Sequence, residues 1–241
     1  MKIFKSILDF LKKSDNFFNL FLLCIKNNSN FDKFVMKKKF FLFLAILTAI
    51  SAIFLFSHSS AQTQTNITRI NEKAEKALSF CKANGYNTDF CILINMKIHS
   101  GKHRLFVYDF KNKTIERKAL CAHGCGKDDK QSTGSQPLFS NEEGSFLTSL
   151  GRYKIGIRSY SKWGINVHYK LHGLDTTNNN AFKRDVVLHS YSPVPANEIY
   201  PLHLPMGYSQ GCPVTDNETM TFLDKKLKNT EKSVLLWIFY E

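Results

Sequence analysis

A histidine and a cysteine near the end of this 241-residue chain have the types and surroundings for nucleophilic catalysis. His189 closes an apolar run, residues 186–189, which predicts a buried strand, and Cys212 lies between Gly211 and Pro213. A cysteine becomes an effective nucleophile when a base takes its proton, and histidine is the usual base. The glycine also permits a sharp turn, in which successive backbone N–H groups can point at one oxygen. The pair is therefore a candidate nucleophile and general base.

A cysteine or a histidine taken alone is more often a packed core residue than a catalytic one. The arrangement around this pair favours catalysis, because a predicted strand ends in His189-Ser190 and is followed by Ser209-Gln210-Gly211-Cys212. This arrangement resembles the L,D-transpeptidase family, and within it the branch of the murein L,D-transpeptidase catalytic domain. Further landmarks of that branch recur in order over residues 90–240: Ser100-Gly101, Ala122-His123-Gly124, Phe139-Ser140-Asn141, Ser149-Leu150-Gly151 and Leu174-Asp175.

The resemblance implies a mostly β, β-sandwich-like catalytic domain with a few short helices, over residues 90–241. It also implies a cysteine acyltransferase that forms 3→3 cross-links between peptidoglycan stem peptides through a cysteine thioester, with release of D-Ala. Two positions depart from the family pattern. Gln210 stands where many members have a second histidine, and Val214 stands where many have Arg or Asn. Both departures concern substrate anchoring and leave the nucleophile and the base in place.

By the same resemblance, Cys212 is the nucleophile, His189 is the base, and Ser190 orients the imidazole through its backbone carbonyl. The oxyanion would be held by backbone N–H groups of Gln210, Gly211 and Cys212. Three further residues are candidates for substrate binding: His123, Ser209 and Tyr208. The chemistry needs no metal and no organic cofactor.

Other functions remain open at this stage. If water replaces the acceptor amine, the same site is an L,D-carboxypeptidase. A non-catalytic cell-wall-binding module with the same fold is the alternative from another class. The formal charge of +13 suggests nucleic acid, but residues 1–61 contribute +6 of it, from 9 Lys against 3 acids. The remaining positive charges are scattered, which suits an anionic wall polymer or a solvated surface, and we expect no nucleic-acid partner.

The N-terminal quarter has the pattern of an export signal. Met36 and three lysines precede an uncharged apolar run, residues 40–56, and Ser59-Ser60-Ala61 offers small residues for a signal peptidase. We therefore interpret residues 36–61 as a signal peptide, with a membrane anchor as the alternative, and expect the mature protein in the periplasm or cell envelope. Residues 1–35 are a doubtful extension, and Met36 is the simpler start. Residues 62–89 are expected to be a linker and a helix.

The remaining sequence predicts a helix followed by many short strands. The helix is indicated by the helical spacing of Ala74, Ala77, Leu78 and Cys81. Residues 92–98, 105–110, 114–122, 153–157, 165–171, 185–189 and 234–240 are expected strands. The strand at 165–171 alternates apolar and polar residues, so His168 and His172 fall on its polar face and are interpreted as surface residues. Residues 215–218 form a capping box for a helix that ends near Leu227.

Five cysteines follow the predicted signal, and an odd number in an exported chain suggests pairs plus one functional thiol. The nearest pairs in sequence are Cys81 with Cys91 and Cys121 with Cys125, but spacing does not fix the pairing. Cys121-x-His123-x-Cys125 also suggests zinc. No fourth ligand stands at the spacing of a zinc site, so we expect no metal.

Overall fold

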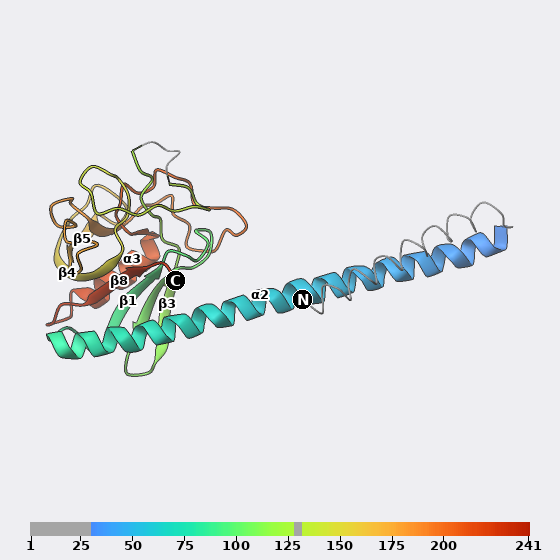
Figure 1. The fold of residues 1–241 in the computed structure, drawn as a ribbon, viewed down its shortest axis with the longest axis horizontal. Helices are drawn as coiled ribbons and strands as arrows, with labels where there is room; N and C mark the ends of the chain where they lie inside the picture. The colour runs from blue at the N-terminus through green and yellow to red at the C-terminus, as the bar shows by residue number, and fades with distance from the viewer. Residues whose placement is uncertain (1–29, 128–131) are drawn as a thin grey trace. The chain divides into compact units, whose positions relative to one another are not determined.

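The computed structural model describes residues 30–127 and 132–241. Residues 1–29, which make up most of the doubtful extension, therefore lie outside the described part of the chain. The chain divides into two compact units, residues 1–65 and 66–241. The second unit contains the sheet (Figure 1). By their residue numbers, all of the candidate site residues also belong to this unit.

The helix α2 runs from Asn30 to Asn84 and includes most of residues 62–89, which were expected to be a linker followed by a helix. No Gly or Pro interrupts residues 62–84, so nothing in their sequence ends the helix earlier. Over the described residues, no helix has both the length and the apolar character that a membrane crossing requires.

The described strands form one eight-stranded sheet, so the expectation of a mostly β domain is confirmed. The sheet order is β3-β2-β1-β8-β4-β5-β6-β7. The strands are β1 (Phe90–Asn95), β2 (Leu105–Asp109), β3 (Thr114–Ala119), β4 (Gly151–Tyr160), β5 (Val167–Gly173), β6 (Val187–Ser190), β7 (Val214–Thr215) and β8 (Leu235–Phe239).

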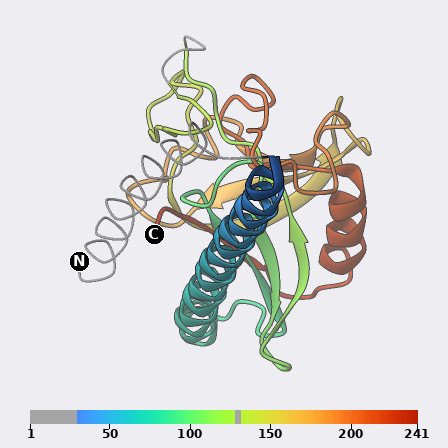
Figure 2. The ribbon, with the colours of Figure 1, turned by 90° about the vertical axis from the view of Figure 1, so that its right-hand side faces the viewer.

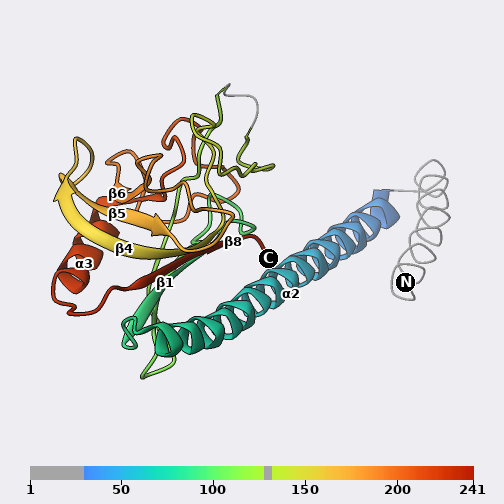
Figure 3. The same cartoon turned by 60° about the vertical axis from the view of Figure 1, so that its left-hand side comes forward.

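The last strand in sequence, β8, lies in the middle of the sheet. It pairs parallel with β1 and antiparallel with β4, and it thereby joins the two halves of the sheet. Figure 3 shows β4 curving strongly where it passes between β8 and β5. The register of β4 with β5 shifts between Ile155 and Arg158, and such an irregularity increases bending. The candidate site lies at the β6–β7 edge of this curved sheet.

The two faces of the sheet bury separate apolar clusters. One cluster joins seven of the strands, all but β7, to helix α3 (Asn217–Leu227), which lies beside the sheet in Figure 2. The other cluster joins β1, β2 and β8 to the last four turns of α2, where Ile70, Ala74, Ala77 and Cys81 are fully or almost fully buried. The helical spacing seen in the sequence is therefore confirmed as the face that α2 packs on the sheet.

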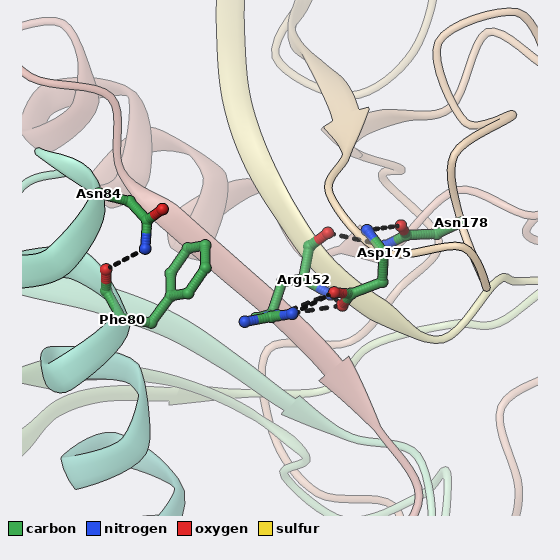
Figure 4. A network of polar contacts seen from close by, with 5 residues as sticks. All are labelled: Phe80, Asn84, Arg152, Asp175 and Asn178. Carbon is green, nitrogen blue, oxygen red and sulfur yellow. Dashed lines mark hydrogen bonds and ion pairs between the residues drawn. The ribbon is translucent and has the colours of Figure 1, made fainter.

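The polar network of Figure 4 fixes the start of β4. Arg152 and Asp175 form a bidentate ion pair, and the Arg152 N–H also donates to Asp175 Oδ2 at 2.7 Å. Asn178 Nδ2 donates to the Arg152 carbonyl at 2.8 Å, and the guanidinium lies over the Phe80 ring of α2 at 4.4 Å. Asp175 is one of the family landmarks, and here its contacts are structural.

Helix α3 begins one residue later than the capping box suggested. Its N-cap is Asp216, whose carboxylate accepts from the Thr219 N–H at 2.8 Å. Thr215 belongs to β7, and its hydroxyl donates to the Leu120 carbonyl at 2.9 Å, so it is not available as the cap. The helix ends at Leu227, as expected.

Candidate active site

Two short parallel strands bring the histidine and cysteine segments together. In the β6–β7 register His189 pairs with Val214, and Cys212 lies two residues before Val214. His189 also pairs with His168 of β5 on its other side. The sheet thus places both sequence-predicted reactive groups at one edge, although 22 residues of chain separate them.

A cavity of about 560 Å³ opens at this edge. His189, Cys212, Ser209, Gln210 and Tyr208 all line it, so the structure brings together five of the candidate residues. The other lining residues come from the β4–β5 connection and the adjoining strands: Tyr160, Ser161, Lys162, Trp163, His168, Val187, Tyr191 and Gly207. His168, which the sequence placed on the surface, is half-buried in this wall. His168 is the polar-face residue of β5 that borders this cavity.

The imidazole of His189 has a defined orientation. Its Nδ1 lies 3.0 Å from the Ser190 carbonyl oxygen, which can only accept, so Nδ1 carries the proton. The other nitrogen, Nε2, is then left with a lone pair. Burial lowers the pKa of His189 below the ordinary imidazole value, and His168 lowers it further, while the bond to Ser190 acts in the opposite direction. The ring is therefore neutral at neutral pH and can accept a proton.

The Cys212 thiol is half-buried, and its hydrogen-bonding neighbours are backbone groups. Sγ accepts from the Val187 N–H at 3.4 Å and lies 3.9 Å from the Asp185 carbonyl. Burial raises the pKa of the thiol. The Val187 N–H and two cations, Lys170 and Arg184, oppose this rise in pKa. Within the described residues, Sγ and the imidazole share no hydrogen bond. At rest the pair is a neutral thiol beside a neutral base.

The turn before Cys212 is held by the hydroxyl of Ser209. Ser209 Oγ donates to the Cys212 carbonyl at 2.6 Å and accepts from the Gly211 N–H at 3.0 Å. Gly211 has φ = +117°, in the region that favours glycine. Since the Gly211 N–H already has a partner, the backbone donors left for an oxyanion at this turn are those of Gln210 and Cys212. Ser209 therefore shapes the turn, and its contact with a substrate stays a prediction.

His123 does not line the cavity, although its neighbours contact the cysteine turn. Ala122 bridges to Val214, and the Cys125 N–H donates to the Ser209 carbonyl at 3.1 Å. The His123 ring is buried instead against Arg104, whose Nη2 donates to Nδ1 at 2.8 Å. Burial and the nearby Arg104 cation lower the pKa of His123 to about 4. His123 thus belongs to the support behind the site and stays neutral.

The same contacts bear on the zinc alternative. Both ring nitrogens of His123 are occupied, Nδ1 by Arg104 and Nε2 by the Thr133 carbonyl at 3.2 Å. The Cys121 and Cys125 thiols each donate to a neighbouring carbonyl. In the part of the chain that the structure describes, no three His, Cys, Asp or Glu side chains are grouped as metal ligands.

Arg184 is the residue that sequence analysis missed. Its Nη1 donates to the Ser140 carbonyl at 2.9 Å, and its Nη2 donates to the Leu147 carbonyl at 2.6 Å. The same guanidinium contacts the hydroxyls of Ser145 and Ser149 at 3.2 and 3.3 Å. Arg184 therefore ties the segment 140–149 to the start of the histidine strand, beside Gly211. A charged residue just before an apolar run looks like a solvated strand end, so only its long-range contacts reveal this function.

Comparison with known proteins gives one family match. The family model described as the L,D-transpeptidase catalytic domain matches residues 61–238. No curated protein matches the chain.

Several solved structures are similar to this chain. A mutant form of the helical cell shape determining protein Pgp2 from Campylobacter jejuni is 16% identical with a TM-score of 0.40, over 65% of this chain and 49% of that one. A second structure of that protein is 14% identical with a TM-score of 0.39, over 63% and 48% of the two chains. An L,D-transpeptidase from Xylanimonas cellulosilytica is 11% identical with a TM-score of 0.33, over 67% and 68%. The alignment spans about half the length of the Campylobacter protein.

Proposed function

This chain belongs to the L,D-transpeptidase catalytic domain family, and from that membership we propose that it is an exported cysteine acyltransferase that remodels peptidoglycan stem peptides. The observation that carries the proposal is the shared cavity of Cys212 and His189, in which the imidazole is held with Nε2 free of its proton. A thiol and a neutral, oriented base are the two groups that acyl transfer through a thioester requires.

The proposed reaction begins with proton transfer. His189 Nε2 takes the Cys212 proton as Sγ attacks the carbonyl of the third stem residue, and the electron pair of that carbonyl moves onto its oxygen. The N–H groups of Gln210 and Cys212 support that oxyanion. Collapse of the intermediate breaks the bond to the terminal D-Ala, whose nitrogen receives the proton from His189. The enzyme is left as a thioester at Cys212.

The second half of the reaction decides the product. An amine from a second stem attacks the thioester, its proton passes through His189 to the cysteine sulfur, and a 3→3 cross-link forms. Attack by water would give a trimmed stem and make the protein an L,D-carboxypeptidase. Because the thiol and the imidazole are both neutral at rest, proton transfer belongs to the reaction itself. Catalytic hydrogen bonds of this kind often tighten only when substrate binds.

Mass spectrometry of the purified chain with tetrapeptide muropeptides tests this proposal. We expect an acyl adduct at Cys212 and 3→3 dimers, and no adduct in the Cys212→Ala variant, which should keep the circular dichroism of the wild type. His189→Gln should lower the rate about 10²- to 10⁴-fold, as loss of a general base does. Tripeptides alone would favour the carboxypeptidase. Absence of any adduct or product would favour a wall-binding module.

Export is a second part of the proposal, supported by the lysines and apolar run of residues 36–61. We propose that this segment is a signal peptide, that Met36 is the start, and that the mature chain begins at Gln62 in the periplasm or envelope. Intact-mass measurement on protein from an exporting host tests this. A mass that includes residues 36–61 would contradict cleavage.

A further inference from the structure

Three aromatic rings form a continuous row along one wall of the Cys212 cavity. The Tyr208 ring meets the Tyr191 ring edge-on at 5.3 Å, and Tyr191 meets Trp163 edge-on at 5.4 Å. Tyr191 and Tyr208 are half-buried, whereas Trp163 keeps 54% of its surface exposed. Each of the three residues lines the cavity. We call this row, Trp163, Tyr191 and Tyr208, the aromatic wall.

The turn that carries the exposed Trp163 is held by several backbone contacts. The Trp163 backbone N–H donates to Ser161 Oγ at 3.1 Å, and the Trp163 carbonyl accepts from the Asn166 backbone N–H at 3.1 Å. The Ile165 N–H donates to Ser190 Oγ at 3.1 Å, which fastens the turn to the residue next to His189. Gly164 has φ = +62°, and a Cβ there would lie 2.0 Å from Ser190 Oγ. The turn is therefore seated on the histidine strand, and Trp163 is presented at a fixed place.

An indole with half of its surface exposed contributes little to the core, and on this ordered turn beside Tyr191 it is available to a ligand in the cavity. The ring offers a flat apolar face, and the matching ligand presents C–H groups in a plane with polar groups at its rim. A pyranose ring has this character. The peptide part of a muropeptide offers few such surfaces, because its stem consists of small and charged residues.

The dimensions of the cavity agree with a sugar at this position. The carbonyl attacked by Cys212 belongs to the third stem residue, and three extended residues span about 10 Å. A cavity of this volume is also on the order of 10 Å across. A stem that runs from Cys212 along the length of the cavity therefore has its sugar-bearing end near the limit of the cavity. We propose that the aromatic wall, with Trp163 at its outer end, binds the glycan portion of the peptidoglycan donor, an inference that rests on the proposed function.

Kinetics with matched substrates test this inference. Trp163→Ala should raise the KM for a disaccharide-tetrapeptide about 3- to 10-fold, as expected for loss of one aromatic contact, and leave the KM for the sugar-free tetrapeptide unchanged. Trp163→Phe keeps an aromatic ring at this position and should return the KM for the disaccharide-tetrapeptide most of the way to the wild-type value. Phe182→Ala is the matched control, because Phe182 is also 54% exposed but stacks on His172 and does not line this cavity. It should change neither KM.

Fluorescence supplies a readout that needs no turnover. The chain has two tryptophans, Trp163 and the half-buried Trp237 of β8. In the Cys212→Ala protein, the peptide-free disaccharide should change the tryptophan emission, and Trp163→Phe in that background should abolish the change. Equal KM effects on both substrates would place the peptide, not the sugar, against Trp163 and overturn the inference. A tryptophan emission that does not change when the disaccharide is added would also overturn it. If no substrate is turned over but the emission responds, the proposed reaction fails while sugar binding stands.

Discussion

Replacement of Arg184 by Met tests whether a single guanidinium holds the cysteine turn and the segment 140–149 in place. The substitution keeps an unbranched apolar side chain in place of the aliphatic part of arginine, but it removes the charge and four hydrogen bonds. The two hydroxyl partners can rotate toward water, so their loss costs little. The carbonyls of Ser140 and Leu147 each lose a charged hydrogen-bond donor. Leaving a buried carbonyl without a donor costs roughly 1–3 kcal/mol of stability. Because Arg184 is half-exposed, water can replace some of the hydrogen bonds that these carbonyls lose. We therefore expect the free energy of unfolding to fall by about 2–3 kcal/mol.

The same variant should change the reactivity of Cys212. Burial raises the pKa of this thiol, and the positive charge of Arg184 is one of the effects that oppose the rise. Removing a cation disfavours the thiolate, so the pKa moves upward and alkylation by iodoacetamide shifts to higher pH. Arg184→Lys keeps the charge and should restore the pH of alkylation, but it reaches at most one of the two carbonyls and should remain destabilised.

Urea unfolding and pH-dependent alkylation are the two measurements. Lys183→Ala is the control, because Lys183 is an exposed neighbouring cation that pairs with Glu143, and its loss should alter neither measurement. An Arg184→Met protein with wild-type stability and a wild-type alkylation profile would refute the reasoning. A loss of stability with an unchanged alkylation profile would refute its electrostatic half.

Two further predictions concern the support of the site. His123 has a pKa of about 4 in the folded chain and an ordinary pKa near 6.5 in the unfolded chain, so between these two values the unfolded state binds more protons. The free energy of unfolding should therefore fall as the pH drops from 6.5 to 4, with a total loss on the order of 3 kcal/mol. His123→Gln, which can still accept from Arg104 and donate to Thr133, should flatten that part of the pH–stability curve, and an unchanged slope would contradict the assignment. Gly211→Ala should cost about 1–3 kcal/mol and slow Cys212 alkylation, because φ is +117° and the added Cβ would lie 3.0 Å from the Leu147 carbonyl. Gly207→Ala is its control, since φ there is +91° but no atom lies within 4 Å of the added Cβ; equal alkylation rates in the two variants would show that the Leu147 contact is unimportant.

Local patterns in the sequence predicted all of the described strands except the two-residue β7, and they also indicated the candidate nucleophile and base. Alternation in residues 165–171 agrees with the burial of Val167, Tyr169 and Leu171 on one face of β5. The helical spacing from Ala74 to Cys81 agrees with the buried face of α2. These features depend on backbone periodicity, which is a property of neighbours in the chain and is therefore visible in the sequence. The motif around Cys212 was visible for the same reason, because its glycine, cysteine and serine are adjacent.

The family landmarks were visible in the sequence, but their physical function was not. Asp175 holds Arg152 at the start of β4, and Ser140 offers its carbonyl to Arg184. His123, expected at the rim of the site, is turned toward the buried Arg104 behind it. These residues contact partners that are distant in the sequence. Which partner each one contacts therefore depends on which strands lie side by side in the sheet.

Sheet order was the decisive feature that only the tertiary structure supplied. Placing β8 between β1 and β4, and β6 beside both β5 and β7, brings His168, His189 and Val214 into register. That register places His168 of β5 in the cavity wall and seats the turn of Trp163 on Ser190. The sequence by itself determined which groups can react and which local elements carry them. The tertiary structure decided their protonation, their neighbours and the shape of the cavity, because burial and charge at each group arise from segments far away in the chain.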